Sequence, residues 1–286
     1  MHRLANLIFG AGMGIAIAGA LAALPAFAQT GVRLEPRKLV EKRLKSFADD
    51  NQAREEMIRR WLIESGCTKS NLASEPVRPG LPPNVICVLP GETQEEIVVG
   101  AHTDKVSGAG DGVVDNWSGA SLLPSLFFSL SSQKRHHTFV FVGFTGEEKG
   151  LVGSEYYVAR LSPSERGHIE AMVNMDSLGL TSTKVWASHS DKALLDALTS
   201  VAAMDKLPAS SANVDDLGTS DSESFASYHI PRITLHSVTP ETIHILHSAD
   251  DNPAAINMHD YYDSYHLIAE YLAYLDRVLK PAAQRK

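Results

Sequence analysis

Apolar residues first recur at helical spacing between residues 35 and 64. One face collects Leu39, Val40, Leu44 and Phe47, and a second, after Asp49-Asp50-Asn51, collects Met57, Ile58, Trp61 and Leu62. We expect these helices to cover the sheet. The following segment, 71–83, is rich in Pro, Ser and Gly and is typical of a loop.

Short apolar runs then alternate with helix-like segments. Buried strands are predicted at 97–101, 138–144 and 171–175, with further strands at 84–89 and 231–236. Helices are predicted at 117–130, 153–161, 192–203 and 259–279. This alternation indicates a three-layer α/β/α fold with a mixed, mainly parallel central sheet.

The first 28 residues have the pattern of an export signal. Arg3 precedes an apolar stretch over 4–24, and Ala26-Phe27-Ala28 predicts cleavage before Gln29. A single membrane anchor is the alternative, because the apolar stretch is almost long enough to span a bilayer. Pro25 and the small residues favour cleavage, so we expect residues 29–286 to form one exported domain, periplasmic or secreted, with no membrane anchor after cleavage.

Composition narrows the class of protein. With 44% hydrophobic and 21% charged residues, the chain can bury a sizeable core. Its net charge of -8 argues against a nucleic-acid partner, because no basic face is available to neutralise phosphates. The only cysteines, Cys67 and Cys87, can form a disulfide in an oxidising compartment or remain two buried thiols. Nothing in the sequence sets the oligomeric state.

Metal-binding residue types follow three of the predicted strands. His102-Thr103-Asp104 comes after the first, Glu147-Glu148 after the second and Asp176 after the third. Ligands of open α/β sheets bind outside the carboxyl ends of the strands, so these side chains are expected at one edge. Imidazole and carboxylate groups are the ligands of catalytic zinc.

The spacing of these residues along the chain suggests a separate role for each side chain. His102 and Asp104 are two residues apart and leave an extended backbone on the same face, so Asp104 can hold the His102 ring. Asp115 can bridge two cations, or it can simply cap the helix that follows it. Glu147 and Glu148 point in different directions, so one can bind metal while the other faces the attacking water.

Several motifs resemble those of the di-zinc aminopeptidases related to bacterial leucyl aminopeptidase, a family that also includes glutamate carboxypeptidase and glutaminyl cyclase. The similar runs are Gly100-Ala101-His102-Thr103-Asp104, Val114-Asp115-Asn116-Trp117-Ser118-Gly119, the stretch 144–154 around Gly146-Glu147-Glu148, Asn174-Met175-Asp176, Ser220-Asp221, Tyr228-His229-Ile230-Pro231 and His247-Ser248-Ala249-Asp250-Asp251. They cover nearly all of the chain after the signal.

The resemblance implies two Zn²⁺ ions. It assigns His102 and Asp176 to one ion and Glu148 and His247 to the other, with Asp115 between them. It also implies that Glu147 is the general base, that Asp104 orients His102, and that the substrates are peptides with a free N-terminus. His247 is preferred over the nearby histidines because His-Ser-x-x-Asp fits the final ligand motif; the others are His236, His244, His259 and His266.

Two features depart from the family and concern the shape of the substrate pocket. Trp117 is bulky where a small residue is common, and the loop 105–111 is short and Gly-rich. The leading prediction is an exported metallo-aminopeptidase. The alternatives are a glutaminyl cyclase-like enzyme on the same scaffold and a non-catalytic binding module.

Overall fold

A computed structural model describes residues 31–215 and 218–279, and the predicted signal peptide over 1–28 lies outside the described residues. The centre is an eight-stranded sheet with the order β1-β2-β4-β3-β5-β8-β6-β7. The strands are β1 Leu72–Glu75, β2 Asn84–Leu89, β3 Glu96–His102, β4 Thr138–Phe144, β5 Ile169–Met175, β6 Thr183–Val185, β7 Ala209–Ser211 and β8 Arg232–His236.

The four central strands are parallel. β3 pairs with β4 on one side and with β5 on the other, and β5 pairs in parallel with β8. The outer pairs β1 with β2, β2 with β4 and β6 with β8 are antiparallel, whereas β6 and β7 are parallel. The prediction of a mixed, mainly parallel sheet is confirmed.

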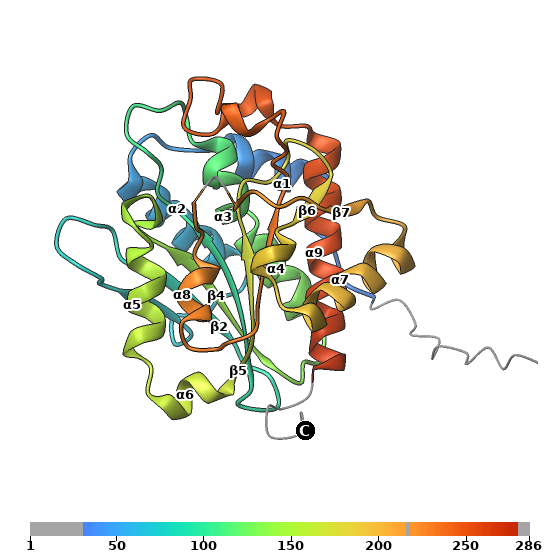
Figure 1. Cartoon of the computed structure of the whole chain (residues 1–286). Coiled ribbons are helices and arrows are strands. Elements are labelled where there is room, and N and C mark those ends of the chain that lie inside the picture. The colour runs from blue at the N-terminus through green and yellow to red at the C-terminus, as the bar shows by residue number, and fades with distance from the viewer. Residues whose placement is uncertain (1–30, 216–217, 280–286) are drawn as a thin grey trace, which may run out of the picture.

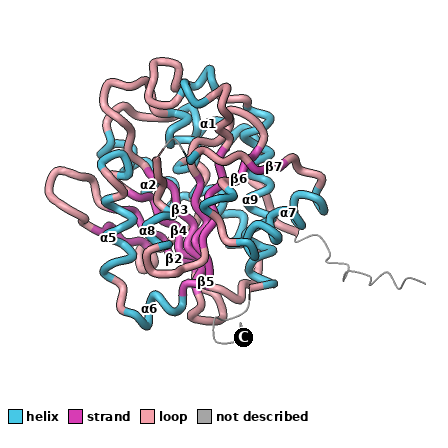
Figure 2. Tube along the Cα trace, in the orientation of Figure 1, coloured by secondary structure: helices cyan, strands magenta, loops and turns pink. Residues whose placement is uncertain are grey.

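Helices cover both faces of this sheet, as Figures 1 and 2 show. The longer helices are α1 Arg37–Lys45, α2 Asn51–Glu64, α4 Leu123–Ser131, α5 Val152–Arg160, α7 Lys192–Asp205 and α9 Met258–Val278, and the short ones are α3 Ser118–Ala120, α6 Pro163–His168 and α8 Ser222–Ala226.

Alternation along the central strands divides the apolar side chains between two cores. Ile97 and Val99 of β3 join the larger core with residues of α1, α2, α4, α7 and α9. Val98, between them, joins a smaller core with residues of α5 and α8. Successive side chains of a strand point to opposite faces, so a continuous apolar run is buried on both.

The predicted elements differ from the structure at several places. The segment 71–83 contains the edge strand β1, which the prediction of a loop missed; its side chains are exposed or half-buried, so it lacks an apolar pattern. The helix predicted over 117–130 is broken at Ser121 and Leu122, ahead of Pro124 in the first turn of α4. The short strands β6 and β7 and the short helices α6 and α8 were not predicted.

Trp117, one of the two departures from the family pattern, is a core residue. Its ring is fully buried in the larger core, where it lies 5.6 Å from the ring of Trp61. Its Nε1 donates a hydrogen bond to the backbone oxygen of Arg43 at 3.2 Å.

Cys67 and Cys87 form a disulfide with a Cα to Cα distance of 6.3 Å. It links the chain just after α2 to the middle of β2. Among the described residues, no helix combines the length and the apolarity needed to cross a membrane.

Candidate metal centre

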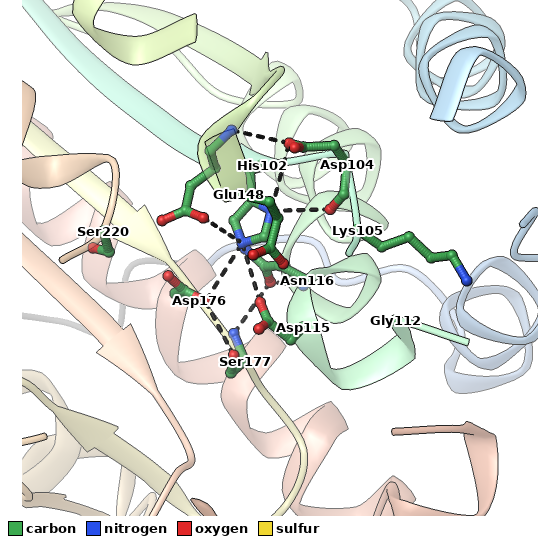
Figure 3. Close-up of polar contacts among 12 residues, drawn as sticks. His102, Asp104, Lys105, Gly112, Asp115, Asn116, Glu148, Asp176, Ser177 and Ser220 are labelled. Carbon is green, nitrogen blue, oxygen red and sulfur yellow. Dashed lines mark hydrogen bonds and ion pairs between the residues drawn. The ribbon is translucent and has the colours of Figure 1, made fainter. Parts of the chain in front are cut away.

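The carboxyl ends of three adjacent strands supply most of the site. His102 is the last residue of β3, Asp176 follows β5 directly, and Glu147 and Glu148 lie in a short 3-10 turn, Glu147–Lys149, after β4. Because β3 lies between β4 and β5, these groups meet at one edge, as the sequence predicted. Figure 3 shows the His102 ring among the carboxylates.

The first ligand group consists of His102, Asp115 and Asp176. Nε2 of His102 lies 3.1 Å from Oδ1 of Asp115 and 3.8 Å from Oδ1 of Asp176. His102 is only 1% exposed, so its ring is held away from solvent.

The second ligand group consists of Asp115, Glu148 and His247. Nε2 of His247 lies 3.0 Å from Oδ2 of Asp115 and 3.1 Å from Oε2 of Glu148. Asp115 therefore offers one oxygen to each of these two groups. A third set of possible ligands joins His102 to Glu147 and Glu148. Only His102 and His247, among the histidines of the described residues, belong to these groups.

Asp115 does not cap a helix, which was the alternative interpretation. It lies within a tight turn, Val113–Trp117, and no side-chain cap is made at the start of α3. The next residue fixes this turn to the sheet: Nδ2 of Asn116 donates to the Met175 oxygen at 2.8 Å, and its Oδ1 accepts from the Ser177 nitrogen at 3.2 Å.

Asp104 contacts His102 through its backbone more closely than through its carboxylate. Nδ1 of His102 lies 3.1 Å from the backbone oxygen of Asp104 and 3.8 Å from Oδ1. The same Oδ1 accepts a hydrogen bond from the Glu147 nitrogen at 3.2 Å. Asp104 therefore links the imidazole to the turn that carries Glu147.

Burial and mutual repulsion strongly raise the pKa values of two carboxyl groups of the site. Burial, with the neighbouring carboxylates Asp221, Asp176 and Asp115, raises the pKa of Glu147 to about 10, although His102 opposes the shift. Burial also raises the pKa of Glu148 to about 7. A bound cation would favour the ionised form of both groups.

The pKa values of Asp115, His102 and His247 shift in the direction opposite to the one that burial alone would cause. Burial would raise the pKa of Asp115, but the adjacent His102 and His247 hold it below its usual range. Burial lowers the pKa of His102, but the carboxylates around it, Glu147 first, raise it well above its usual value. Contact with Asp115 raises the pKa of His247 to about 9.

Asp221 belongs to the same buried environment. It is 1% exposed, and burial raises the pKa of its carboxyl to about 7. The sequence marked it only as part of a similar motif and gave it no place at the site. Its proximity depends on α8 packing beside β5 and β8, which spacing along the chain does not reveal.

The donor set fits zinc. Nε2 of His102 and Oε1 of Glu148 are buried polar atoms that make no hydrogen bond within the described residues. Two ligand atoms on one tetrahedral zinc, each about 2.0 to 2.2 Å from it, lie roughly 3.3 to 3.6 Å apart. The distances of 3.0 to 3.8 Å within the two groups bracket this value.

A cavity of about 370 Å³ opens beside the ligands. Its apolar lining consists of Trp186, Val214, Val238, Ile243 and Leu246. His236 also lines it, but both ring nitrogens are occupied: Nε2 lies 2.9 Å from the Ala212 oxygen, and Nδ1 accepts from the Val238 nitrogen at 3.1 Å. His236 is therefore a structural residue of the wall.

Comparisons with known proteins agree with this geometry. A probable leucine aminopeptidase from Arthroderma otae is 32% identical over 124 residues, which is 39% of this chain and 34% of the relative. The chain thus matches about a third of that relative's length.

Two solved structures share the fold. A zinc aminopeptidase from Bacillus subtilis has a TM-score of 0.61 at 22% identity, covering 71% of this chain and 51% of that one. The glutaminyl cyclase of an Acidobacteriales bacterium has a TM-score of 0.68 at 19% identity, covering 89% of this chain and 99% of that one.

The profile of Peptidase family M28 matches residues 84–272, about two thirds of the chain. This range contains all seven residues of the metal centre predicted from the sequence, and the fold and ligand groups agree with the match. The chain therefore belongs to peptidase family M28.

Proposed function

We propose that this protein is an exported aminopeptidase that works with two zinc ions. The observation that carries the proposal is that Asp115 joins two ligand groups, one with His102 and Asp176 and one with Glu148 and His247. Two three-residue groups that share one carboxylate suit a pair of neighbouring ions, and each group leaves positions open for water or substrate.

Zinc bound in these groups would supply Lewis acidity that polarises the scissile carbonyl and activates a water molecule. Glu147 lies beside both groups, with Oε2 4.0 Å from Nε2 of His102, and its carboxylate can accept the proton of that water. It then holds the proton at a carboxylate oxygen and donates it to the leaving amine. The hydrogen bond from the Glu147 nitrogen to Asp104 keeps this turn in place.

The substrate class follows from the charge and shape of the cavity. Its carboxylates can hold the α-ammonium group of a free N-terminus, which favours exopeptidase action. Next to them, Trp186, Val238 and Ile243 form an apolar wall. We expect a preference for peptides with an apolar first residue.

Export rests on the signal pattern at the start of the chain and on the cysteines. A disulfide between Cys67 and Cys87 suits an oxidising compartment such as the periplasm or the extracellular medium.

The test is zinc content per chain of the purified mature protein, with hydrolysis of aminoacyl p-nitroanilides before and after chelation. We expect two zinc ions and chelator-sensitive hydrolysis. Glu147→Gln should retain both ions and lower kcat about 10²- to 10⁴-fold, because the amide cannot accept the proton. Glu64→Gln, at an exposed position of α2, is the matched control.

Glutaminyl cyclisation is a second candidate, favoured by the match to 99% of the Acidobacteriales cyclase chain. In that reaction the α-amine of an N-terminal glutamine attacks its own side-chain amide and releases ammonia. Ammonia release from Gln-peptides without hydrolysis of p-nitroanilides would replace the aminopeptidase proposal. Absence of zinc and of both activities would indicate a binding module.

A further inference from the structure

Asp251 connects the two loops that carry Asp115 and His247. Its carboxylate is buried, with 1% of the residue exposed. Oδ1 accepts a hydrogen bond from the Val114 nitrogen at 2.6 Å, and Oδ2 accepts one from the Asp115 nitrogen at 3.2 Å. A buried carboxylate is costly unless such donors satisfy it, so these two contacts define its orientation.

The backbone of the same residue makes a third connection. The Asp111 nitrogen donates to the backbone oxygen of Asp251 at 2.8 Å. Asp251 lies four residues after His247, so one short segment holds both an imidazole of the site and the turn that presents Asp115.

The two loops also pack without spare room. Gly110 has a φ of +62°, and a Cβ there would lie 2.2 Å from the Ser248 oxygen and 2.9 Å from the Asp251 oxygen. Any side chain at this position would push the loops apart. The contact is therefore set by both the hydrogen bonds and the absence of a side chain at Gly110.

Arg54 also holds the Asp115 loop. Its guanidinium, fully buried, donates to the Gly112 oxygen at 3.1 Å and to the Asp111 oxygen, and its Nε donates to the Ala48 oxygen at 2.7 Å. The loop is thus fixed to α2, and Asp251 is the group that fixes it to the His247 segment.

We propose that Asp251 is a positioning residue that holds the Asp115 carboxylate in register with His247 and so sets the spacing of the zinc ligands. The proposal rests on the zinc chemistry proposed above. Each oxygen of Asp115 faces a different imidazole, at 3.1 and 3.0 Å, so a small rotation of its turn disturbs both groups. Asp251 affects both Asp115 and His247 of the second ligand group, because its carboxylate holds the Asp115 turn and its own segment carries His247. In the first group, His102 and Asp176 are fixed by β3 and β5.

The test is a competition titration of zinc into metal-free protein with a chromophoric chelator, with no activity measurement involved. Asp251→Asn replaces one acceptor oxygen with an NH₂ group that cannot accept from the turn. We expect one of the two zinc affinities to fall about 10- to 100-fold and the other to fall less. Asp250→Asn, at the exposed neighbouring position, should match the wild type.

A second variant separates positioning from a general loss of folding. Gly110→Ala retains Asp251 but forces the loops apart, and it should weaken the same zinc affinity. Circular dichroism of both metal-free variants must show the wild-type fold. Wild-type zinc affinities in both variants would overturn the inference while leaving the zinc enzyme intact, whereas a wild type that binds no zinc would overturn the proposed function and this inference together.

Discussion

The two halves of the candidate metal centre are built in different ways. His102 and Asp176 lie at the ends of hydrogen-bonded neighbouring strands. His247 lies on a loop, and its own backbone φ is 56°. The His102 side chain is 1% exposed and that of His247 is 54% exposed. The sheet therefore fixes one half, and loop contacts must fix the other. If this difference governs zinc binding and stability, variants in the two halves should behave differently.

Removal of an imidazole should have the largest effect, and the two halves should respond differently. We expect His102→Gln and His247→Gln each to lower kcat/KM by more than about 100-fold, because both remove a proposed zinc ligand. His102→Gln should also reduce the free energy of unfolding of the zinc-loaded protein more than His247→Gln does, because the His102 side chain is buried and that of His247 is half exposed. Urea unfolding and zinc content check both effects. Equal stability losses in the two variants would contradict the comparison.

The metal-free protein should lose stability as the pH rises from 7 to 9. The pKa of Glu147 is raised to about 10 by burial, and that of His247 to about 9 by Asp115. In this range the folded state binds more protons than the unfolded state, so its stability falls with rising pH. Saturating zinc should reduce the slope, because the cation replaces the protons.

Urea titrations at pH 7 and 9, with chelator or with zinc, measure this slope. Glu147→Gln removes one of the titrating groups and should flatten the profile of the metal-free protein. A metal-free protein that becomes more stable between pH 7 and 9 would show that these two groups do not control the balance.

The disulfide should have the smallest effect on the site. Neither Cys67 nor Cys87 lines the cavity, and the loop between them spans 20 residues. Replacement of both by serine should reduce the free energy of unfolding by about 3 kcal/mol, because the unfolded chain is no longer constrained. Zinc affinities should not change. Denaturant unfolding and the zinc titration test this, and a loss of zinc would connect the disulfide to the site.

The positions of the residues in the sheet-bound half could be predicted from the sequence because their signals are local. A buried parallel strand is a continuous apolar run, and the polar residue that ends it marks the ligand edge. His102, Glu147, Glu148 and Asp176 all follow this rule. The strands β6 and β7 escaped prediction because they contain three residues each and little apolar content.

The loop-bound half depended on family resemblance, since no periodicity places His247 opposite Asp115. The position of Asp251 shows why: its carboxylate bonds to Val114 across 137 residues of sequence. Likewise, nothing in the sequence showed that the turn before Trp117 directs its ring into the core. Contacts between residues so far apart in the sequence become visible only in the folded structure.

The lining of the cavity has an evolutionary consequence. Four of the five proposed zinc ligands lie between residues 102 and 176, while the apolar wall comes from loops between residues 186 and 246. Under the proposed function, mutations of these apolar residues can therefore alter which peptides fit while those four ligands stay unchanged. Such a division would let related enzymes change their substrate preference while they keep the same catalytic residues.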